Sequence, residues 1–233
     1  MGRVEQEFLT SGTWTRPAGH AGDWVEVIVV GSGGGGGTDT DGGGGGGAET
    51  VIRIIDVSSI TKGSGTVTVT IGAGGAVETD GNDSTFGAFL TARAGKAGHD
   101  SSGGWARLGG ASGGGNESTR EWLTEDGNQA FTEYGLDGPT SEYGSPGGAG
   151  SSGIDNVPGA ICGNGGSSFG GGGSGLVSGS QSYGGGGGSW GAGGWGGYLS
   201  VDADKHAPAN SGGGGRGYGG VGGSGYCRLV WEE

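Results

Sequence analysis

The chain has 233 residues, of which 70 are glycine and only 5 are proline, and its 24 acidic and 11 basic side chains give a formal net charge of −13. Glycine makes up about 7% of an ordinary protein, and collagen needs a strict Gly-X-Y period with abundant proline, so this glycine excess belongs to neither class. The scattered basic residues argue against nucleic-acid binding, which uses clustered Lys and Arg. No apolar run approaches the roughly 18 residues that a membrane-spanning helix needs.

The first 90 residues have the character of a small all-β unit. Segments rich in β-branched and aromatic residues, bounded by turn-forming residues, predict strands at 4–8, 13–16, 24–30, 49–55, 66–71 and 84–90. Residues 66–71 read Thr-Val-Thr-Val-Thr-Ile, so the valines should face a core and the threonines the opposite side. Residues 24–30 alternate at first and then become continuously apolar, which is typical of a central strand.

A further strand is predicted at the end of the chain, at residues 226–231. It follows a long glycine-rich tract and needs a partner, because an isolated strand leaves its backbone groups unpaired. The nearest available sheet is the N-terminal one. We therefore expect the last strand to return to that sheet and to bring the two chain ends together, with Leu229 and Trp231 in the core.

Pure glycine runs recur along the chain, at 33–37, 42–47, 113–115, 170–173, 184–188 and 212–215 among others. An ordered glycine costs about 0.5–1 kcal/mol more than alanine, so an ordered glycine-rich chain needs compensation other than side-chain burial. A polyproline II helix makes no internal hydrogen bonds, and when built of glycine it can bond laterally to neighbours on every side. These runs predict a lattice of polyglycine type II helices, and a disordered glycine-rich tract is the alternative.

The predicted fold is thus all-β, with a small N-terminal β-sandwich closed by the C-terminal strand and a polyglycine type II helix lattice with long loops. The sandwich domain is expected at residues 1–98, completed by 226–233, and the lattice at 99–225. Two glycine-poor intervals, 116–145 and 198–210, supply the loops of the second domain. The first of them is long, acidic and aromatic.

The motifs typical of catalytic and cofactor sites lack the sequence context that they need. Residues 27–36 match a strand followed by GxGxxG, but six more glycines at 42–47 leave no helix whose N-terminus could hold a pyrophosphate. The chain has no Gly-x-Ser-x-Gly elbow with credible Asp and His partners, and nothing selects one carboxylate pair among 24. The sequence therefore predicts no enzyme and no cofactor.

Two acidic segments carry oxygen atoms of the kind that ligate calcium, one with Asp39 and Asp41 and the other with Asp80, Asn82 and Asp83. Neither matches the twelve-residue loop of an EF-hand, and no calcium-binding nonapeptide repeat is present. Solvated acidic turns are the simpler interpretation, and no metal site is predicted.

The histidines and cysteines show no metal-ligand spacing either. His20, His99 and His206 lack a second ligand at a suitable distance in sequence, so all three are expected on the surface. Cys162 and Cys227 lie 65 positions apart and belong to no CxxC pair. Two free or buried thiols are the simplest interpretation, and a single disulfide is the alternative.

Several of these motifs, taken in order, resemble a known family. Residues 8–19, Phe-Leu-Thr-Ser-Gly-Thr-Trp-Thr-Arg-Pro-Ala-Gly, are similar to the opening of glycine-rich proteins from tailed bacteriophages. The apolar strand that runs into the glycines at 33–37 continues the pattern, as do residues 67–75 and 81–87. The likeness extends over residues 8–98 and the closing strand. As a set, the motifs resemble phage tail-fibre and minor tail proteins with a glycine-rich domain.

The central region resembles, more loosely, the tip adhesins of T-even-like phages. In those proteins polyglycine II helices form a lattice and distal loops contact the host receptor. The attachment domain of those adhesins has no counterpart in this sequence, and its glycine runs are less regular.

The resemblance implies a virion component, a tail tip or minor tail protein that is synthesised in the host cytoplasm and binds a bacterial surface glycan or protein without catalysis. The start of the chain lacks the basic and apolar regions of a signal peptide, which agrees with that location. Other phage tail proteins are expected partners, and so is a homo-oligomer, since fibre proteins are commonly trimers. Nucleic acid and membrane insertion are not expected.

Candidate receptor contacts come from the two glycine-poor intervals, because aromatic faces suit both sugars and protein hot spots. They are Trp122, Phe131, Tyr134, Tyr143, Tyr198 and His206. Each of these aromatic side chains could instead pack inward as an anchor of its own loop. Two other interpretations stay open for the whole chain: a purely structural glycine-rich virion component, and an ice-binding protein built on a polyglycine lattice.

Overall fold

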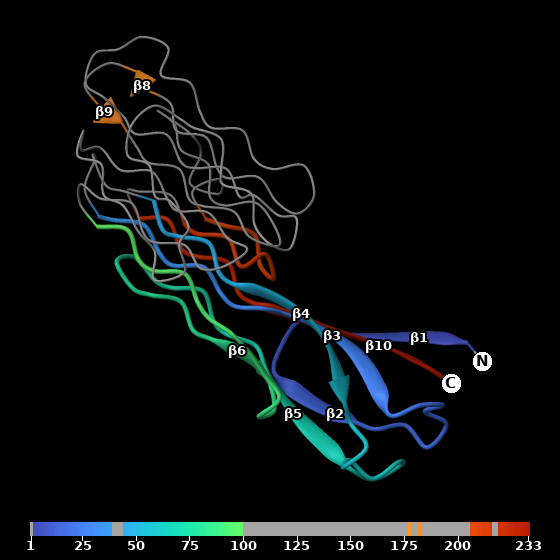
Figure 1. Cartoon of the computed structure of the whole chain (residues 1–233). Helices are drawn as coiled ribbons and strands as arrows, with labels where there is room; N and C mark the ends of the chain where they lie inside the picture. The colour runs from blue at the N-terminus through green and yellow to red at the C-terminus, as the bar shows by residue number, and fades with distance from the viewer. Residues whose placement is uncertain (1, 39–43, 100–176, 179–180, 183–205, 216–218) are drawn as a thin grey trace.

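A computed structural model describes residues 2–38, 44–99, 177–178, 181–182, 206–215 and 219–233 (Figure 1). These residues form strands, turns and extended segments, and none of them is helical. The all-β class predicted from the sequence is confirmed. In the described part of the chain no helix is long and apolar enough to cross a membrane.

Two antiparallel four-stranded sheets make up most of the regular structure. The first sheet has the order β1 (Arg3–Phe8), β10 (Tyr226–Glu232), β3 (Trp24–Val30) and β4 (Thr50–Asp56). The second sheet has the order β2 (Gly12–Thr15), β5 (Thr66–Thr70), β6 (Ser84–Phe86) and β7 (Leu90–Ala92). A short ladder joins β8 (Val177–Ser178) to β9 (Gln181–Ser182).

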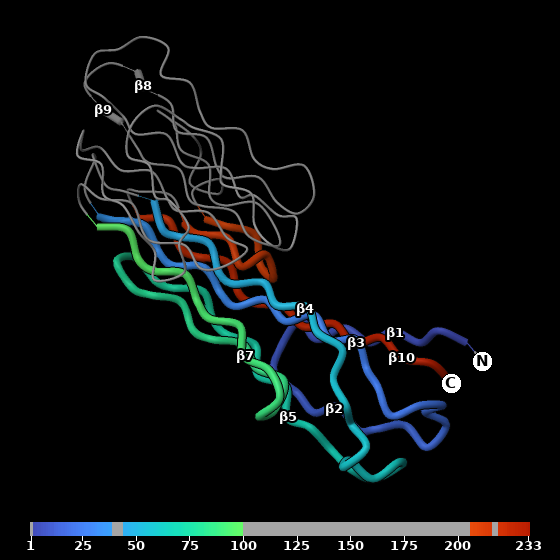
Figure 2. Tube along the Cα trace, viewed as in Figure 1, coloured from blue at the N-terminus to red at the C-terminus, as the bar shows by residue number. Residues whose placement is uncertain are grey.

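The C-terminal strand returns to the N-terminal sheet, as predicted. It lies between β1 and β3, with Trp231 opposite Val4 and Leu229 opposite Val27. Both Leu229 and Trp231 are buried in the core. The chain ends are joined by backbone hydrogen bonds, because Gly2 N donates to Glu233 O (2.7 Å) and Glu233 N donates to Gly2 O (2.9 Å). The two termini therefore lie side by side (Figure 2).

The inward faces of the two sheets share one hydrophobic cluster. Val27 of the first sheet and Val69 of the second are both fully buried within it. The alternation of β5 is confirmed, since its two valines are buried and its threonines exposed. Trp14 links the sheets: its ring lies 5.8 Å from that of Phe86 and 6.1 Å from that of Trp231, measured between centroids.

The single strand expected at 84–90 is wrong, because the chain reverses there. β6 ends at Phe86 and β7 begins at Leu90, and the two pair antiparallel. Gly87 adopts a φ of +52°, a left-handed conformation that glycine reaches without a steric penalty. Phe89 N then donates to Phe86 O (3.1 Å) and closes the turn.

Beyond the sheets, extended segments without strand or helix structure lie beside one another (Figure 2). We refer to these segments together as the glycine segments; they are residues 31–37, 44–49, 72–82, 93–98, 206–215 and 219–225. Backbone hydrogen bonds join them directly: Gly34 N donates to Gly46 O (3.0 Å) and Gly45 N to Gly215 O (2.7 Å). Residues 31–37 are buried throughout. Their backbone polar groups are thus satisfied inside the molecule by other backbone groups.

Close approach requires glycine at the centre of this bundle. A Cβ added to Gly34 would lie closer than 3.0 Å to the backbone of Lys96 and Ala97, and one added to Gly33 would meet Gly213 and Gly214 in the same way. No side chain can occupy that space without moving a neighbouring segment.

Candidate functional site

Most of the predicted receptor contacts lie outside the described residues. They are Trp122, Phe131, Tyr134, Tyr143 and Tyr198. His206 falls within them and is exposed, as expected, and its Nδ1 atom accepts a hydrogen bond from the backbone N of Val221 (3.0 Å). This bond joins the residues at one end of the 206–215 segment to the neighbouring 219–225 segment.

Arg16 is a buried charged residue that the sequence did not single out. Its side chain is only 2% exposed, within the Trp-Thr-Arg-Pro part of the phage-like motif. Its Nη1 donates to the backbone oxygens of Val57 (2.7 Å) and Ile60 (2.8 Å). Its Nη2 pairs with Asp23 Oδ1 (2.5 Å). The guanidinium thereby fixes two loops to the end of β2, which is a structural role.

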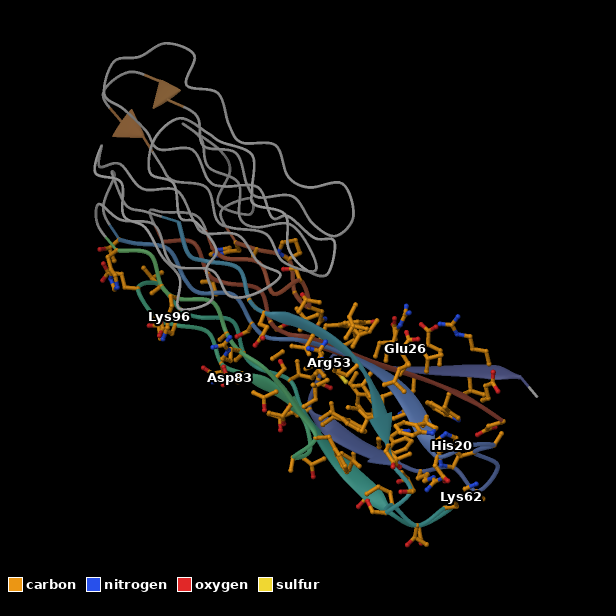
Figure 3. All side chains as sticks on the ribbon, viewed as in Figure 1. His20, Glu26, Arg53, Lys62, Asp83 and Lys96 are labelled. Carbon is orange, nitrogen blue, oxygen red and sulfur yellow. The ribbon has the colours of Figure 1, made fainter. Side chains whose placement is uncertain are left out.

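His20 was expected on the surface, and this is wrong, since its side chain is only 2% exposed. Its Nδ1 accepts from Arg16 Nε (3.3 Å), because an arginine nitrogen can only donate. Its Nε2 must then carry the proton and donate to Trp24 O (3.1 Å), which makes the ring neutral. Lys62 Nζ also donates to the backbone oxygen of His20 (2.7 Å), and Figure 3 shows the two residues side by side. His99 is exposed, as predicted.

The second acidic segment supports the glycine segments. Asp80 accepts from Ala97 N (2.8 Å) and pairs with Lys96 Nζ (2.7 Å). Asp83 accepts from Ala94 N (2.8 Å). Figure 3 shows Asp83 and Lys96 along the same edge of the molecule. These exposed carboxylates therefore hold residues 93–98 in place, and no metal-ligand group gathers among the described residues. Asp39 and Asp41 lie outside those residues.

Cys227 is a buried free thiol in the described part of the chain, where Cys162 is not included. Burial raises the pKa of the Cys227 thiol to about 12. Because the thiolate is the nucleophile, this cysteine is unsuited to catalysis at neutral pH.

A pocket of about 470 Å³ opens where the first sheet approaches the chain termini. It is lined by Arg3, His20, Ala21, Gly22, Trp24, Glu26, Val230, Trp231 and Glu232. Figure 3 shows Glu26 on β3 and His20 in the loop that precedes this strand. Trp24 is 58% exposed at the pocket, an unusual position for the largest apolar side chain. The alternation of β3 indicates that Trp24 points away from the face that carries Val25. It could not reveal that Trp24 is exposed to solvent on the outer face of the first sheet.

The sheets and the buried glycine backbone define the class of protein. A family model described as "Glycine-rich domain" matches residues 7–232. The chain belongs to this family of glycine-rich domains. The comparison with curated proteins found no match.

Proposed function

We propose that the chain is a tail tip or minor tail protein of a tailed bacteriophage, and that it binds a bacterial surface glycan or protein without catalysis. The observation that carries the proposal is the buried glycine backbone, because backbone packing of this kind can support binding loops where hydrophobic side chains are scarce. The phage-like motifs in residues 8–98 give the proposal its biological setting. Its location would then be the virion, with other tail proteins as partners.

The support we infer is a polyglycine type II lattice attached to a β-sandwich that β10 closes. Residues 33–36 exchange backbone hydrogen bonds with five other segments, at 75–79, 46, 98, 215 and 220–223. Gly33, for example, donates to Gly223 O and accepts from Gly75 N, while Gly34 donates to Gly46 O and accepts from Gly215 N. A strand in a sheet has two neighbours at most, whereas a polyglycine helix presents backbone groups on every side.

In this proposal the glycine-poor intervals at 116–145 and 198–210 form the receptor-binding loops. The contacts would be Trp122, Phe131, Tyr134, Tyr143 and Tyr198, with His206 from the described part. An aromatic ring stacks on a sugar face or fills a protein pocket at a small cost in rotamer entropy.

Adhesion is tested with the purified chain and cells of the host of the parent phage. Labelled protein should bind the cells at micromolar concentration, and unlabelled protein should compete with phage adsorption. Alanine at Trp122, Tyr134 and Tyr143 together should abolish binding without changing the melting temperature. The matched control is Phe89→Ala, which removes a partly exposed aromatic ring from the β6–β7 turn. Absence of both binding and competition would refute the proposal.

A purely structural virion component is the second candidate, because a backbone-bonded glycine bundle can serve as a spacer without binding anything. Exchange of residues 116–145 between related phages separates the two. A host range that follows the exchanged segment supports adhesion, and an unchanged host range supports the structural role. An ice-binding protein would instead show thermal hysteresis in the purified chain.

A further inference from the structure

A second surface stands out on the first sheet, on the face turned away from the core. Val25 and Val27 are fully buried, so the alternation of β3 places Trp24 and Glu26 on the outer face. Asp56 pairs opposite Trp24, and Ile54 pairs opposite Glu26. These four side chains therefore share one face at the end of the sheet.

The neighbouring strands β10 and β1 extend this face. Val230 lies opposite Glu26, and Arg3 lies opposite Glu232. Both Trp24 and Ile54 are large and apolar, and they are 58% and 69% exposed. Together with the adjoining pocket of about 470 Å³, the residues make up what we call the Trp24 surface. It comprises Arg3, Trp24, Glu26, Ile54, Asp56, Val230 and Glu232.

The Trp24 surface carries three carboxylates and one cation. Asp56 is held ionised, because the backbone N of Ser58 donates to its Oδ1 (2.8 Å) and lowers its pKa. Glu26 and Glu232 form no ion pair with any residue that the structure describes.

Two glutamates of β1 are already engaged within the sheet. Glu5 pairs with Arg228 (3.4 Å), and Glu7 accepts a hydrogen bond from the hydroxyl of Tyr226 (2.5 Å). The acidic groups without such partners thus gather at the end of the sheet, around the indole of Trp24. An aromatic face bordered by carboxylates attracts a cation through both the ring quadrupole and charge.

We propose that the Trp24 surface binds a basic segment of a partner protein, with a Lys or Arg side chain over the indole and an adjoining apolar side chain against Ile54. The formal net charge of −13 repels nucleic acid and anionic lipid and attracts a basic partner. A neutral sugar would also stack on Trp24 but would draw no benefit from the excess of negative charge. The surface lies at the end of the molecule where the termini meet, away from the glycine segments (Figure 1). Binding of a basic partner there is independent of the proposed receptor-binding role.

The test follows the indole N–H signal of Trp24 by NMR in the full-length ¹⁵N-labelled chain. The probe is the peptide acetyl-Arg-Leu-Arg-amide, and acetyl-Glu-Leu-Glu-amide is the charge-reversed control. The basic peptide should shift the Trp24 signal in a saturable manner, and the acidic peptide should not. Raising the salt from about 50 to about 500 mM should weaken binding several-fold, because exposed charges are screened.

Variants are compared through the backbone amide signal of Glu26, or of Gln where it is replaced. Trp24→Ala should weaken binding of the basic peptide about fivefold, and Glu26→Gln about twofold. Glu78→Gln is the matched control: it removes an exposed carboxylate within the glycine segment 72–82 and keeps the oxygen that accepts from Thr38. Thermal melting checks that each variant folds.

Three outcomes would overturn the proposal. One is no shift of the Trp24 signal at millimolar basic peptide, and another is an equal response to the acidic peptide. The third is a shift produced by the neutral sugar maltotriose and not by the basic peptide, which would assign the surface to saccharides.

Discussion

At the scale of single residues, Arg16 connects segments that are far apart in the sequence, a role that no sequence motif predicted. Its guanidinium donates hydrogen bonds to the backbone oxygens of Gly22, Val57 and Ile60. All three residues lie outside the strands. Asp23, the charge partner of Arg16, stays 56% exposed to water. A buried cation is tolerated here because its donors meet acceptors at short distance.

Replacing Arg16 with methionine should lower the free energy of unfolding by about 2–4 kcal/mol, because the buried carbonyl groups lose their donors. Urea denaturation followed by tryptophan fluorescence measures the change. Arg3→Met is the control, since Arg3 is exposed on β1 and its removal should cost less than about 0.5 kcal/mol. Equal stability of the Arg16 variant and the parent chain would refute this role.

Cys227 gives stability a dependence on alkaline pH. Its thiol has a pKa of about 12 when folded and an ordinary value of 9.0, so the folded state keeps the proton where the unfolded state loses it. The contribution is complete below pH 9 and is lost as pH rises from 9 towards 12. At pH 10 it amounts to a loss of about 1 kcal/mol.

Denaturation at pH 7 and at pH 10 measures this dependence. The Cys227→Ala variant should lose less stability between the two pH values than the parent chain does. The buried thiol should also resist iodoacetamide until the chain is unfolded. Rapid modification of Cys227 in the native protein would contradict its burial.

At the scale of elements, the sequence predicted the strands well where a strand has a distinct buried face. β5 alternates against one core. β3 alternates at first and is then buried on both faces, where Ile28 and Val30 join a second cluster with Tyr226. Both patterns are visible in the sequence, so the inward residues of the two strands follow from it. The pattern wrongly predicted one strand at 84–90, because aromatic residues lie on both sides of Gly87. The turn becomes evident only from the positive φ of that glycine.

Other features depended on contacts that a pattern does not contain. His20 appeared isolated because its partners are the Arg16 side chain and the backbone oxygen of Trp24. The exposure of Trp24 likewise depends on whether other residues cover the outer face of the first sheet, which a strand pattern does not show. Of the predicted receptor contacts, His206 is exposed as expected. The receptor role of all six residues stays a prediction.

β10 should be sensitive to substitution, because it lies inside the first sheet, between β1 and β3. Leu229→Ala should lower the free energy of unfolding by about 2–5 kcal/mol, since the side chain is fully buried. Leu9→Ala, at a position 52% exposed, should cost less than about 1 kcal/mol. Chemical denaturation of the two variants makes the comparison, and similar losses would argue against a core role for β10.

At the scale of the whole molecule, glycine acts as the packing material. Gly34→Ala should destabilise the protein by about 1–3 kcal/mol, because a Cβ there would overlap the backbone of Lys96. This reverses the usual preference for alanine over glycine. Gly2→Ala is the control, since no atom lies within 4 Å of its added Cβ.

Thermal unfolding followed by circular dichroism compares these two variants. A Gly34→Ala protein that melts at or above the temperature of the parent chain would rule out the lattice. The same substitution within 184–188 tests whether the proposed lattice includes that part of the chain. If it does, the substitution should also be destabilising.

The pairing of Gly2 with Glu233 has a mechanical consequence. A force that pulls the two chain ends apart acts perpendicular to the β1–β10 ladder, in an unzipping geometry. The hydrogen bonds from the Arg3–Glu232 pair onward then break one after another. A force applied between the joined ends and the far tips of the glycine segments instead runs along the strands and loads the ladder bonds together. The same domain is therefore compliant when its ends are separated and stiff when it carries tension along its length.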